Sequence, residues 1–232
     1  MTTPPKTTHS VAARLFQLEL LEKALSANVI ACVPTGGGKT FISILLLRET
    51  ASRRRGKSTT TTTTVFSNRW KKKFGVFLVN TVALVSQQAA AIRQHTDEEV
   101  GEYFGTVVEG WKKYDWEKEF ERNTVLVMTA EIFRGILALG YLDLSEDVEV
   151  LIFDECHHCR GRHPYNAIME EFYFRIKNQH SQRNIEPSTL PKIFGMTASP
   201  LNLSLGRKNL PNSQGKLSST TRWTEVNINL SL

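Results

Sequence analysis

The chain has 232 residues, of which 41% are apolar and 22% are charged, and both shares are ordinary for a globular protein. Its net charge of +6 is local, because the stretch from residue 48 to residue 73 alone carries nine Lys or Arg against a single Glu. The remainder is slightly acidic, which disfavours a protein that coats nucleic acid with its whole surface.

The sequence also bounds the cellular setting. No apolar run approaches the roughly 18 residues that a membrane span needs. The first ten residues lack the apolar region of a signal peptide. Three cysteines, Cys32, Cys156 and Cys159, are too few for a disulfide scaffold. We therefore expect an intracellular protein, cytoplasmic or nuclear, with no membrane partner.

Hydrophobic spacing predicts helices and strands in alternation along the chain. The first half is expected to contain a flexible tail over residues 1–13, a helix over 14–27, a strand over 28–33, a helix over 39–50, a basic low-complexity insert over about 52–73, a strand over 75–80 and a helix over 81–95. The second half is expected to contain a strand over 100–104, a charged helix or surface excursion over 111–122, a strand over 124–129, a helix over 131–139, a strand over 148–153, a mostly helical stretch over 163–178, a strand over 192–196 and a polar tail over 203–232.

Several of these strands are apolar along their whole length. Such strands are buried on both faces, and their alternation with helices is typical of a parallel sheet covered by helices on both sides. The expected fold class is therefore α/β, with one domain over residues 14–202.

The first chemical signal is the segment Val33–Thr40, Val-Pro-Thr-Gly-Gly-Gly-Lys-Thr, between a predicted strand and a predicted helix. This is the setting of a P-loop, in which glycines let backbone N–H groups approach phosphate oxygens, the lysine reaches the β- and γ-phosphates, and the threonine hydroxyl holds Mg²⁺. The predicted ATP-binding residues of the loop are Thr35, Gly36, Gly37, Gly38, Lys39 and Thr40. Val33 stands where the strict pattern has glycine, so a glycine-rich turn that binds no phosphate is the alternative.

The second signal is a pair of carboxylates, Asp154 and Glu155, directly after the apolar strand 148–153. A strand that delivers two acids at its carboxyl end matches a Walker B site, where Asp154 would hold the metal and Glu155 would activate water. A strand end with solvated acids is the alternative.

Metal-ligand spacing occurs next to these acids, in Cys156, His158, Cys159 and His163. Four such side chains could bind zinc. A single C-x-x-C lacks the partner pair that most structural zinc sites have, so we favour cysteines that pack beside the nucleotide site.

Together these motifs resemble those of the superfamily 2 helicases of the DECH-box type. The segments that carry the resemblance are Arg14–Gln17 (the adenine-reading motif), Pro34–Thr40 (motif I), Phe77–Gln88 (motif Ia), Val127–Thr129 (the start of motif Ib), Asp154–His157 (motif II) and Thr197–Ser199 (motif III). The likeness is closer to the helicase region of Dicer-like proteins and the related antiviral sensors of double-stranded RNA, and it covers about residues 14–202.

This resemblance implies a RecA-like P-loop NTPase domain, the first of two that sandwich ATP and Mg²⁺. The implied roles are catalysis by Lys39, Asp154 and Glu155, metal binding by Thr40 and Asp154, adenine binding by Arg14 and Gln17, RNA contact by Asn80, Gln87 and Thr129, and coupling by Thr197 and Ser199. Asn80 could equally cap the following helix. No segment matches motifs IV to VI, so the second domain and its arginine finger are expected outside these 232 residues.

We therefore expect the ATP-binding half of a Dicer-like double-stranded-RNA helicase, with weak ATP binding and very slow hydrolysis by the chain alone. Two alternatives stay open, namely another superfamily 2 translocase domain and a truncated nucleotide-binding fragment without turnover.

The basic stretch lies between motifs I and Ia. Lys71–Lys73 could lie near an RNA path, whereas Arg53–Arg55 and the threonine run Thr59–Thr64 are expected to form an inserted loop. Direct RNA contact by this stretch is the less favoured interpretation.

Overall fold

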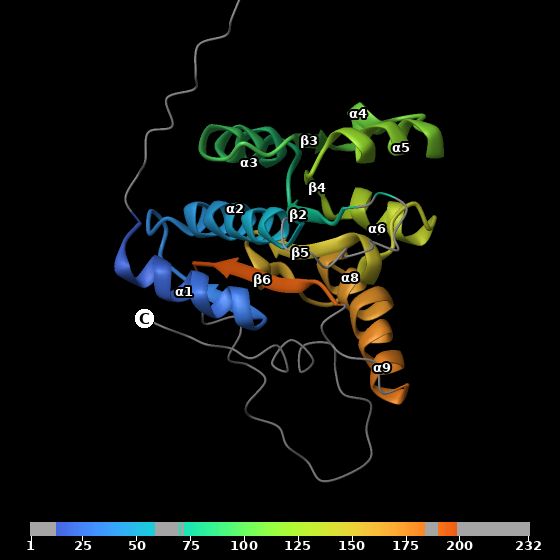
Figure 1. Cartoon of the computed structure of the whole chain (residues 1–232). Helices are drawn as coiled ribbons and strands as arrows, with labels where there is room; N and C mark the ends of the chain where they lie inside the picture. Colours follow the sequence, from blue (N-terminus) through green and yellow to red (C-terminus); the bar gives the residue numbers. More distant parts are fainter. Residues whose placement is uncertain (1–12, 59–69, 71, 184–189, 199–232) are drawn as a thin grey trace, which may run out of the picture.

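The six strands form one parallel sheet in the order β1-β6-β5-β2-β4-β3. The computed structural model describes residues 13–58, 70, 72–183 and 190–198. The strands are β1 (Val29–Cys32), β2 (Phe74–Val79), β3 (Val100–Tyr103), β4 (Val125–Thr129), β5 (Val148–Phe153) and β6 (Lys192–Thr197). The predicted α/β class with a mostly parallel sheet is confirmed (Figure 1).

The sheet is buried on both faces because its strands alternate between two apolar cores. In β2, Val76 and Leu78 enter one core and Phe77 and Val79 enter the other. Such alternation follows from the two-residue period of a strand. β2 is buried at every position and β5 at every position except Glu149, which explains why these two central strands are almost entirely apolar.

Helices cover both faces of the sheet. The longer ones are α1 (Leu15–Ser26), α2 (Lys39–Ser58), α3 (Val82–His95), α5 (Lys113–Arg122), α6 (Ala130–Ala138) and α9 (Phe174–Gln182). The short ones are α4 (Gly105–Val108), α7 (Leu144–Asp147), η1 (Cys156–His158), α8 (Pro164–Ile168) and the π-helical turn η2 (Met169–Tyr173). Buried side chains of α1, α2 and α3 line one core, and those of α5, α6 and α8 line the other.

The start of the basic stretch was expected to be an inserted loop, and this expectation is wrong for Arg53, Arg54 and Arg55. Helix α2 continues through all three arginines to Ser58. The Arg54 guanidinium lies 3.7 Å from Glu98 and 3.8 Å from Glu149, and Arg55 also pairs with Glu98. Arginine is a good helix former, and these distant acids hold the extended helix against the sheet. The threonine run lies outside the described residues.

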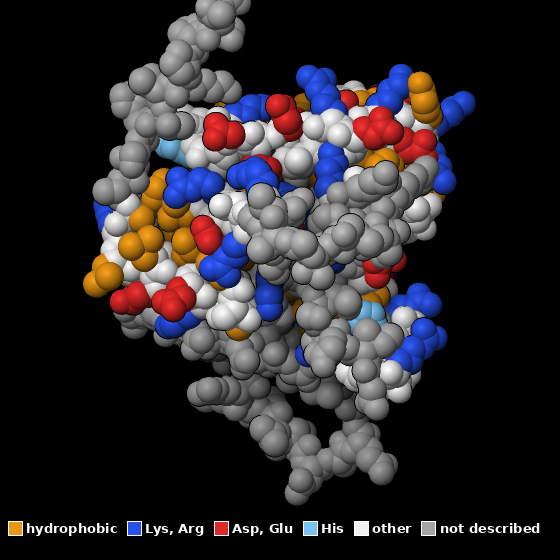
Figure 2. Space-filling model, viewed as in Figure 1, with side chains coloured by type: hydrophobic (Ala, Val, Ile, Leu, Met, Phe, Trp, Pro, Cys, Tyr) orange, Lys and Arg blue, Asp and Glu red, His pale blue; other side chains and the backbone are white. Residues whose placement is uncertain are grey.

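The two lysines that precede β2 also bond within the fold. Lys72 Nζ donates to the Glu121 carbonyl (2.7 Å), and Lys73 Nζ donates to the Ser145 carbonyl (2.7 Å). Burial lowers the pKa of Lys72, and the charge of Arg54 lowers it further. In the upper part of the face in Figure 2, Lys and Arg side chains lie among Asp and Glu side chains. Most of the described basic side chains of this stretch therefore form ion pairs or hydrogen bonds within the domain.

The alternative that Asn80 caps the following helix is wrong. Thr81, not Asn80, is the N-cap residue of α3. In the first turn of α3, Val82 is 50% exposed, whereas the polar Gln88 is buried further along the helix. The orientation of a helix on the sheet decides which of its side chains are buried. In α3 the buried side chains are those of Val85, Gln88, Ala89 and Ile92. The predicted tails, apart from Ala13, lie outside the described residues.

Candidate nucleotide site

The glycine-rich loop connects the end of β1 to the start of α2 at Lys39. Gly36 (φ +79°) and Gly38 (φ +86°) have left-handed backbones, which side chains rarely allow. A Cβ on Gly37 would collide with Val33. Each glycine is thus required by its own geometry, and the loop has the shape of an anion cradle at the head of a helix.

Lys39 joins this loop to the second motif. Its ammonium lies 3.3 Å from the Val33 carbonyl and 3.8 Å from Glu155 Oε1, and its side chain is 12% exposed. Thr40 is half-buried at the start of α2, and Thr35 is exposed. The two motifs are therefore brought together at the carboxyl edge of the sheet, although Lys39 and Glu155 are 116 positions apart in the chain.

Asp154 follows β5 and is 7% exposed. Its Oδ1 accepts the Glu155 N–H at 3.0 Å, and its Oδ2 accepts from Gln88 Nε2 at 3.3 Å. Burial, and next the charge of Glu155, raise the pKa of Asp154. Beneath it, the Tyr165 hydroxyl lies 3.0 Å from both the Asp154 and the Leu78 carbonyl. A divalent cation would relieve the repulsion between the two acids.

Gln88 and Tyr165 were missed by the sequence analysis. The signal for Gln88 is a polar residue three positions after Val85 and four before Ile92, on an otherwise apolar helix stripe. For Tyr165, which is fully buried, the sequence offers no comparable signal.

His157 connects the second motif to the third. Its Nδ1 lies 3.0 Å from Thr197 Oγ1 and 3.1 Å from Glu155 Oε2. Burial, and next the charge of His158, lower the pKa of His157. Thr197, expected to couple the nucleotide site to RNA, is fully buried at the end of β6. Its expected partner Ser199 lies outside the described residues.

Gln17 is packed against the glycine-rich loop. It is 5% exposed, and its Nε2 donates to the Gly37 carbonyl at 3.2 Å. Its Oε1 accepts the Arg14 N–H at 2.9 Å, while the Arg14 side chain is exposed. Near this start of α1, exposed apolar side chains gather at one side of the molecule (Figure 2), and Leu15 is 75% exposed. The structure thus brings Gln17 to the loop of motif I.

The three predicted RNA contacts lie at or near the same edge. Asn80 follows β2 and Thr129 ends the neighbouring β4, where Val79 pairs with Thr129. Asn80 Oδ1 is buried and, among the described residues, has no hydrogen-bond partner. Gln87 is exposed on α3, and Thr129 is only 8% exposed. Exposure therefore favours Gln87 over Thr129 as a side-chain contact.

The zinc alternative is not favoured by the geometry. Cys156 and Cys159 are buried in the apolar core. His163 Nδ1 accepts the Tyr165 N–H (3.2 Å) as the cap of α8, and its ring stacks 5.7 Å from that of His158. In the part of the chain that is described, no three His, Cys, Asp or Glu side chains are grouped to hold a metal.

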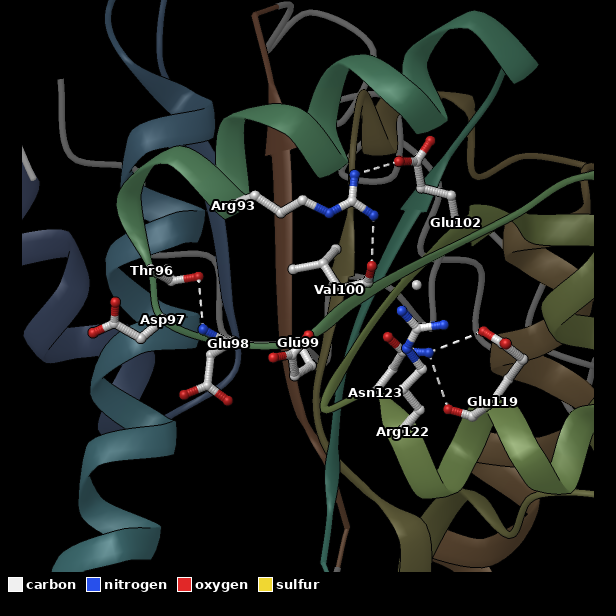
Figure 3. A pocket seen from close by; sticks show the side chains of 11 residues that line it. Arg93, Thr96, Asp97, Glu98, Glu99, Val100, Glu102, Glu119, Arg122 and Asn123 are labelled. Carbon is white, nitrogen blue, oxygen red and sulfur yellow. Dashed lines mark hydrogen bonds and ion pairs between the residues drawn. The ribbon is translucent and has the colours of Figure 1, made fainter. Parts of the chain in front are cut away.

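A cavity of about 420 Å³ lies at the opposite, amino edge of the sheet (Figure 3). Part of its polar lining is paired internally: Arg93 bonds Glu102 and the Val100 carbonyl, and Asn123 Nδ2 donates to Glu119 at 3.0 Å. The residues that line the cavity belong to none of the motifs, so the cavity is separate from the nucleotide site.

Comparisons with known proteins agree with the motif geometry. The DEAD/DEAH box helicase model matches residues 14–203. The chain is 45% identical over 191 residues to Endoribonuclease Dicer homolog 2 of Arabidopsis thaliana, covering 81% of this chain and 12% of that protein. It is 38% identical over 189 residues to Dicer-like protein 1 of Aspergillus terreus, covering 81% and 11%.

Among solved structures, the chain is similar to the Hef helicase domain of Pyrococcus furiosus, with a TM-score of 0.57, 25% identity and coverage of 81% of this chain and 33% of that one. The chain spans about an eighth of the length of the curated relatives it matches. No helix among the described residues has the length and apolarity to cross a membrane.

The family uses ATP with a divalent metal, and the carboxyl edge of this sheet brings together the residue types that such use requires. The chain belongs to the DEAD/DEAH box helicase family, as a helicase ATP-binding domain related to the Dicer-like helicases.

Proposed function

We propose that this chain binds and hydrolyses Mg-ATP in response to double-stranded RNA, as the first RecA-like domain of a Dicer-like helicase that acts in RNA interference inside the cell. The domain would comprise residues 14–202, with residues 1–13 and the polar segment 203–232 outside it and an insert between motifs I and Ia. A second RecA-like domain would complete the site.

One observation carries the proposal: the 3.8 Å approach of Lys39 Nζ to Glu155 Oε1. It joins a phosphate-binding loop to a water-activating carboxylate. With nucleotide bound, the ammonium of Lys39 would turn from Glu155 Oε1 and the Val33 carbonyl to the phosphates, since phosphate is the stronger acceptor. Glu155 would then be free to orient a water.

The remaining roles follow from position. Backbone N–H groups of Gly36, Gly37 and Gly38 would face the phosphates, and Gly37 would give up the hydrogen bond that its N–H now donates to the Pro34 carbonyl (2.9 Å). Thr35 would border the phosphates. Thr40 and Asp154 have the oxygen ligands that Mg²⁺ prefers, and Mg²⁺ supplies charge neutralisation for phosphoryl transfer when it is bound. Arg14 and Gln17 are suited to the adenine side, because Gln17 already contacts the loop.

For RNA, the proposed contacts are Asn80, Gln87 and Thr129, at the carboxyl edge shared by β2 and β4 and on α3. Thr197 and Ser199 would couple this edge to the nucleotide site, since His157 bonds both Thr197 and the catalytic Glu155.

Binding of a fluorescent ATP analogue by the full chain, with and without Mg²⁺, tests the nucleotide half of the proposal. Competition between double-stranded RNA and DNA of one sequence tests the other half, because only RNA offers 2′-hydroxyl groups. Equal affinity for both would favour the DNA-translocase alternative, and binding of nucleotide without any turnover would favour the fragment alternative.

A further inference from the structure

The carboxyl edge contains one contact that no assigned role uses. Gln88 lies in the middle of α3 and is 5% exposed. Its amide Nε2 lies 3.3 Å from Oδ2 of Asp154, the carboxylate proposed to hold the metal. A buried amide that points at a buried carboxylate is a directed contact, because either group alone would be costly in the interior.

The contact bears on the orientation of the Asp154 carboxylate, which the backbone contacts of Asp154 leave open. The backbone of Asp154 is held by its own N–H, which donates to the Leu78 carbonyl at 3.0 Å, and by the Tyr165 hydroxyl at its carbonyl. The carboxylate, however, turns about a broad terminal torsion. Among the described residues, the hydrogen bonds that bear on that torsion come from the Glu155 N–H to Oδ1 and from the Gln88 amide to Oδ2.

Gln88 is itself held firmly. Its neighbours on the buried stripe of α3, Val85, Ala89 and Ile92, are fully buried against the sheet. The amide is thus presented by a packed helix, and the carboxylate that it contacts keeps oxygen lone pairs with which it could bind a metal.

We propose that Gln88 is a positioning residue, which orients the Asp154 carboxylate for the divalent metal and so ties metal binding to helix α3. This inference rests on the proposed function, since it presumes that Asp154 holds the metal of a bound nucleotide. Residues that orient metal ligands in this way cost about 10–100-fold in metal affinity when they are replaced.

The test uses the full chain and the variant Gln88→Met, which keeps the length of the side chain and loses the amide. Affinity for ADP is measured once with Mn²⁺ and once with EDTA. We expect the gain in ADP affinity from Mn²⁺ to fall by about 10-fold or more in the variant, while the affinity in EDTA stays at the wild-type value. Gln94→Met, at an exposed position of the same helix, is the matched control and should match wild type in both.

A double variant separates positioning from packing. In an Asp154→Asn background, Gln88→Met should cause no further loss of the Mn²⁺ effect, because the group on which it acts is gone. Should Gln88→Met fail to fold, Gln88→Asn, which withdraws the amide by one methylene, is measured in the same way and is expected to lose the Mn²⁺ effect as well.

The outcomes discriminate between the two levels of inference. A wild-type Mn²⁺ effect in the folded Gln88 variant, or an equal loss with Mn²⁺ and with EDTA, would overturn the positioning role and leave the proposed function standing. A wild-type chain that binds no ADP, or binds it without any Mn²⁺ effect, would overturn the proposed function instead.

Discussion

The two edges of the parallel sheet use charged side chains in opposite ways. At the amino edge, Arg54 and Arg55 form ion pairs with the buried Glu98, and Lys73 donates to the Ser145 carbonyl. These basic side chains therefore have their partners within the domain. At the carboxyl edge, the contacts of the Lys39 ammonium with the described residues are two long ones, 3.8 Å to Glu155 and 3.3 Å to the Val33 carbonyl. The basic stretch gives the chain its net charge, yet the single lysine in the loop is the better candidate for a ligand. Density of charge along a sequence is therefore a poor guide to a binding site unless the partners of each charge are known.

The largest effect that would test the carboxyl edge is on turnover. Glu155→Gln should lower ATP hydrolysis by about 10²–10⁴-fold, because a general base is lost while the shape of the side chain is kept. Single-turnover measurements with the chain in excess over ATP would reveal the slow rate, and ATP affinity should be retained. Unchanged hydrolysis would remove Glu155 from the catalytic role.

Nucleotide affinity should respond next. Lys39→Ala removes a charge-assisted contact to phosphate, which is expected to cost up to about 3 kcal/mol, or about 100-fold in affinity. Titration with a fluorescent nucleotide measures the change, and Lys113→Ala, at an exposed position of α5, provides a lysine control. Equal losses in the two variants would contradict a specific phosphate contact.

The amino edge should respond in stability, not in binding. Glu98→Gln removes the charge that Arg54 and Arg55 share while keeping the shape of the side chain, and we expect about 1–2 kcal/mol of destabilisation. Urea unfolding followed by circular dichroism gives the value. A drop in RNA affinity without a drop in stability would mean that this edge binds RNA after all.

The smallest effect is expected at the outer face of α2. Arg53 forms an ion pair with Glu49, one helical turn earlier in α2, and the Arg53 side chain is 56% exposed. Arg53→Ala should change stability by no more than about 0.5 kcal/mol. RNA affinity should stay within about twofold at any salt concentration, whereas a loss with a flatter salt dependence would indicate a phosphate contact.

The fold and the motif residues could be predicted because their signals are local. Strand β5 is apolar except for Glu149 and is followed directly by Asp154 and Glu155, so one short segment predicts both the buried strand and the pair of acids. The glycine-rich loop is equally local, and the structure adds only the reason for each glycine. The alternation of these segments was enough to predict the parallel sheet.

Contacts that depend on tertiary packing could not be predicted. Gln88 meets Asp154 across 66 residues, and Tyr165 reaches the carbonyl of Leu78 across 87. Composition misled the sequence analysis at Arg54, because a run of arginines beside a threonine tract resembles a loop. Its ion pairs with Glu98 and Glu149, which hold α2 as a helix there, lie 44 and 95 positions away in the chain.

Glu155 is the one residue other than glycine with a positive φ (+46°) among those described. A side chain in that region costs about 1–2 kcal/mol relative to a right-handed backbone, and glycine would release most of the cost. Selection for higher thermal stability should therefore favour glycine at position 155, and such a variant should lose ATP hydrolysis. At this position, stability and the proposed catalytic role make opposite demands on the residue.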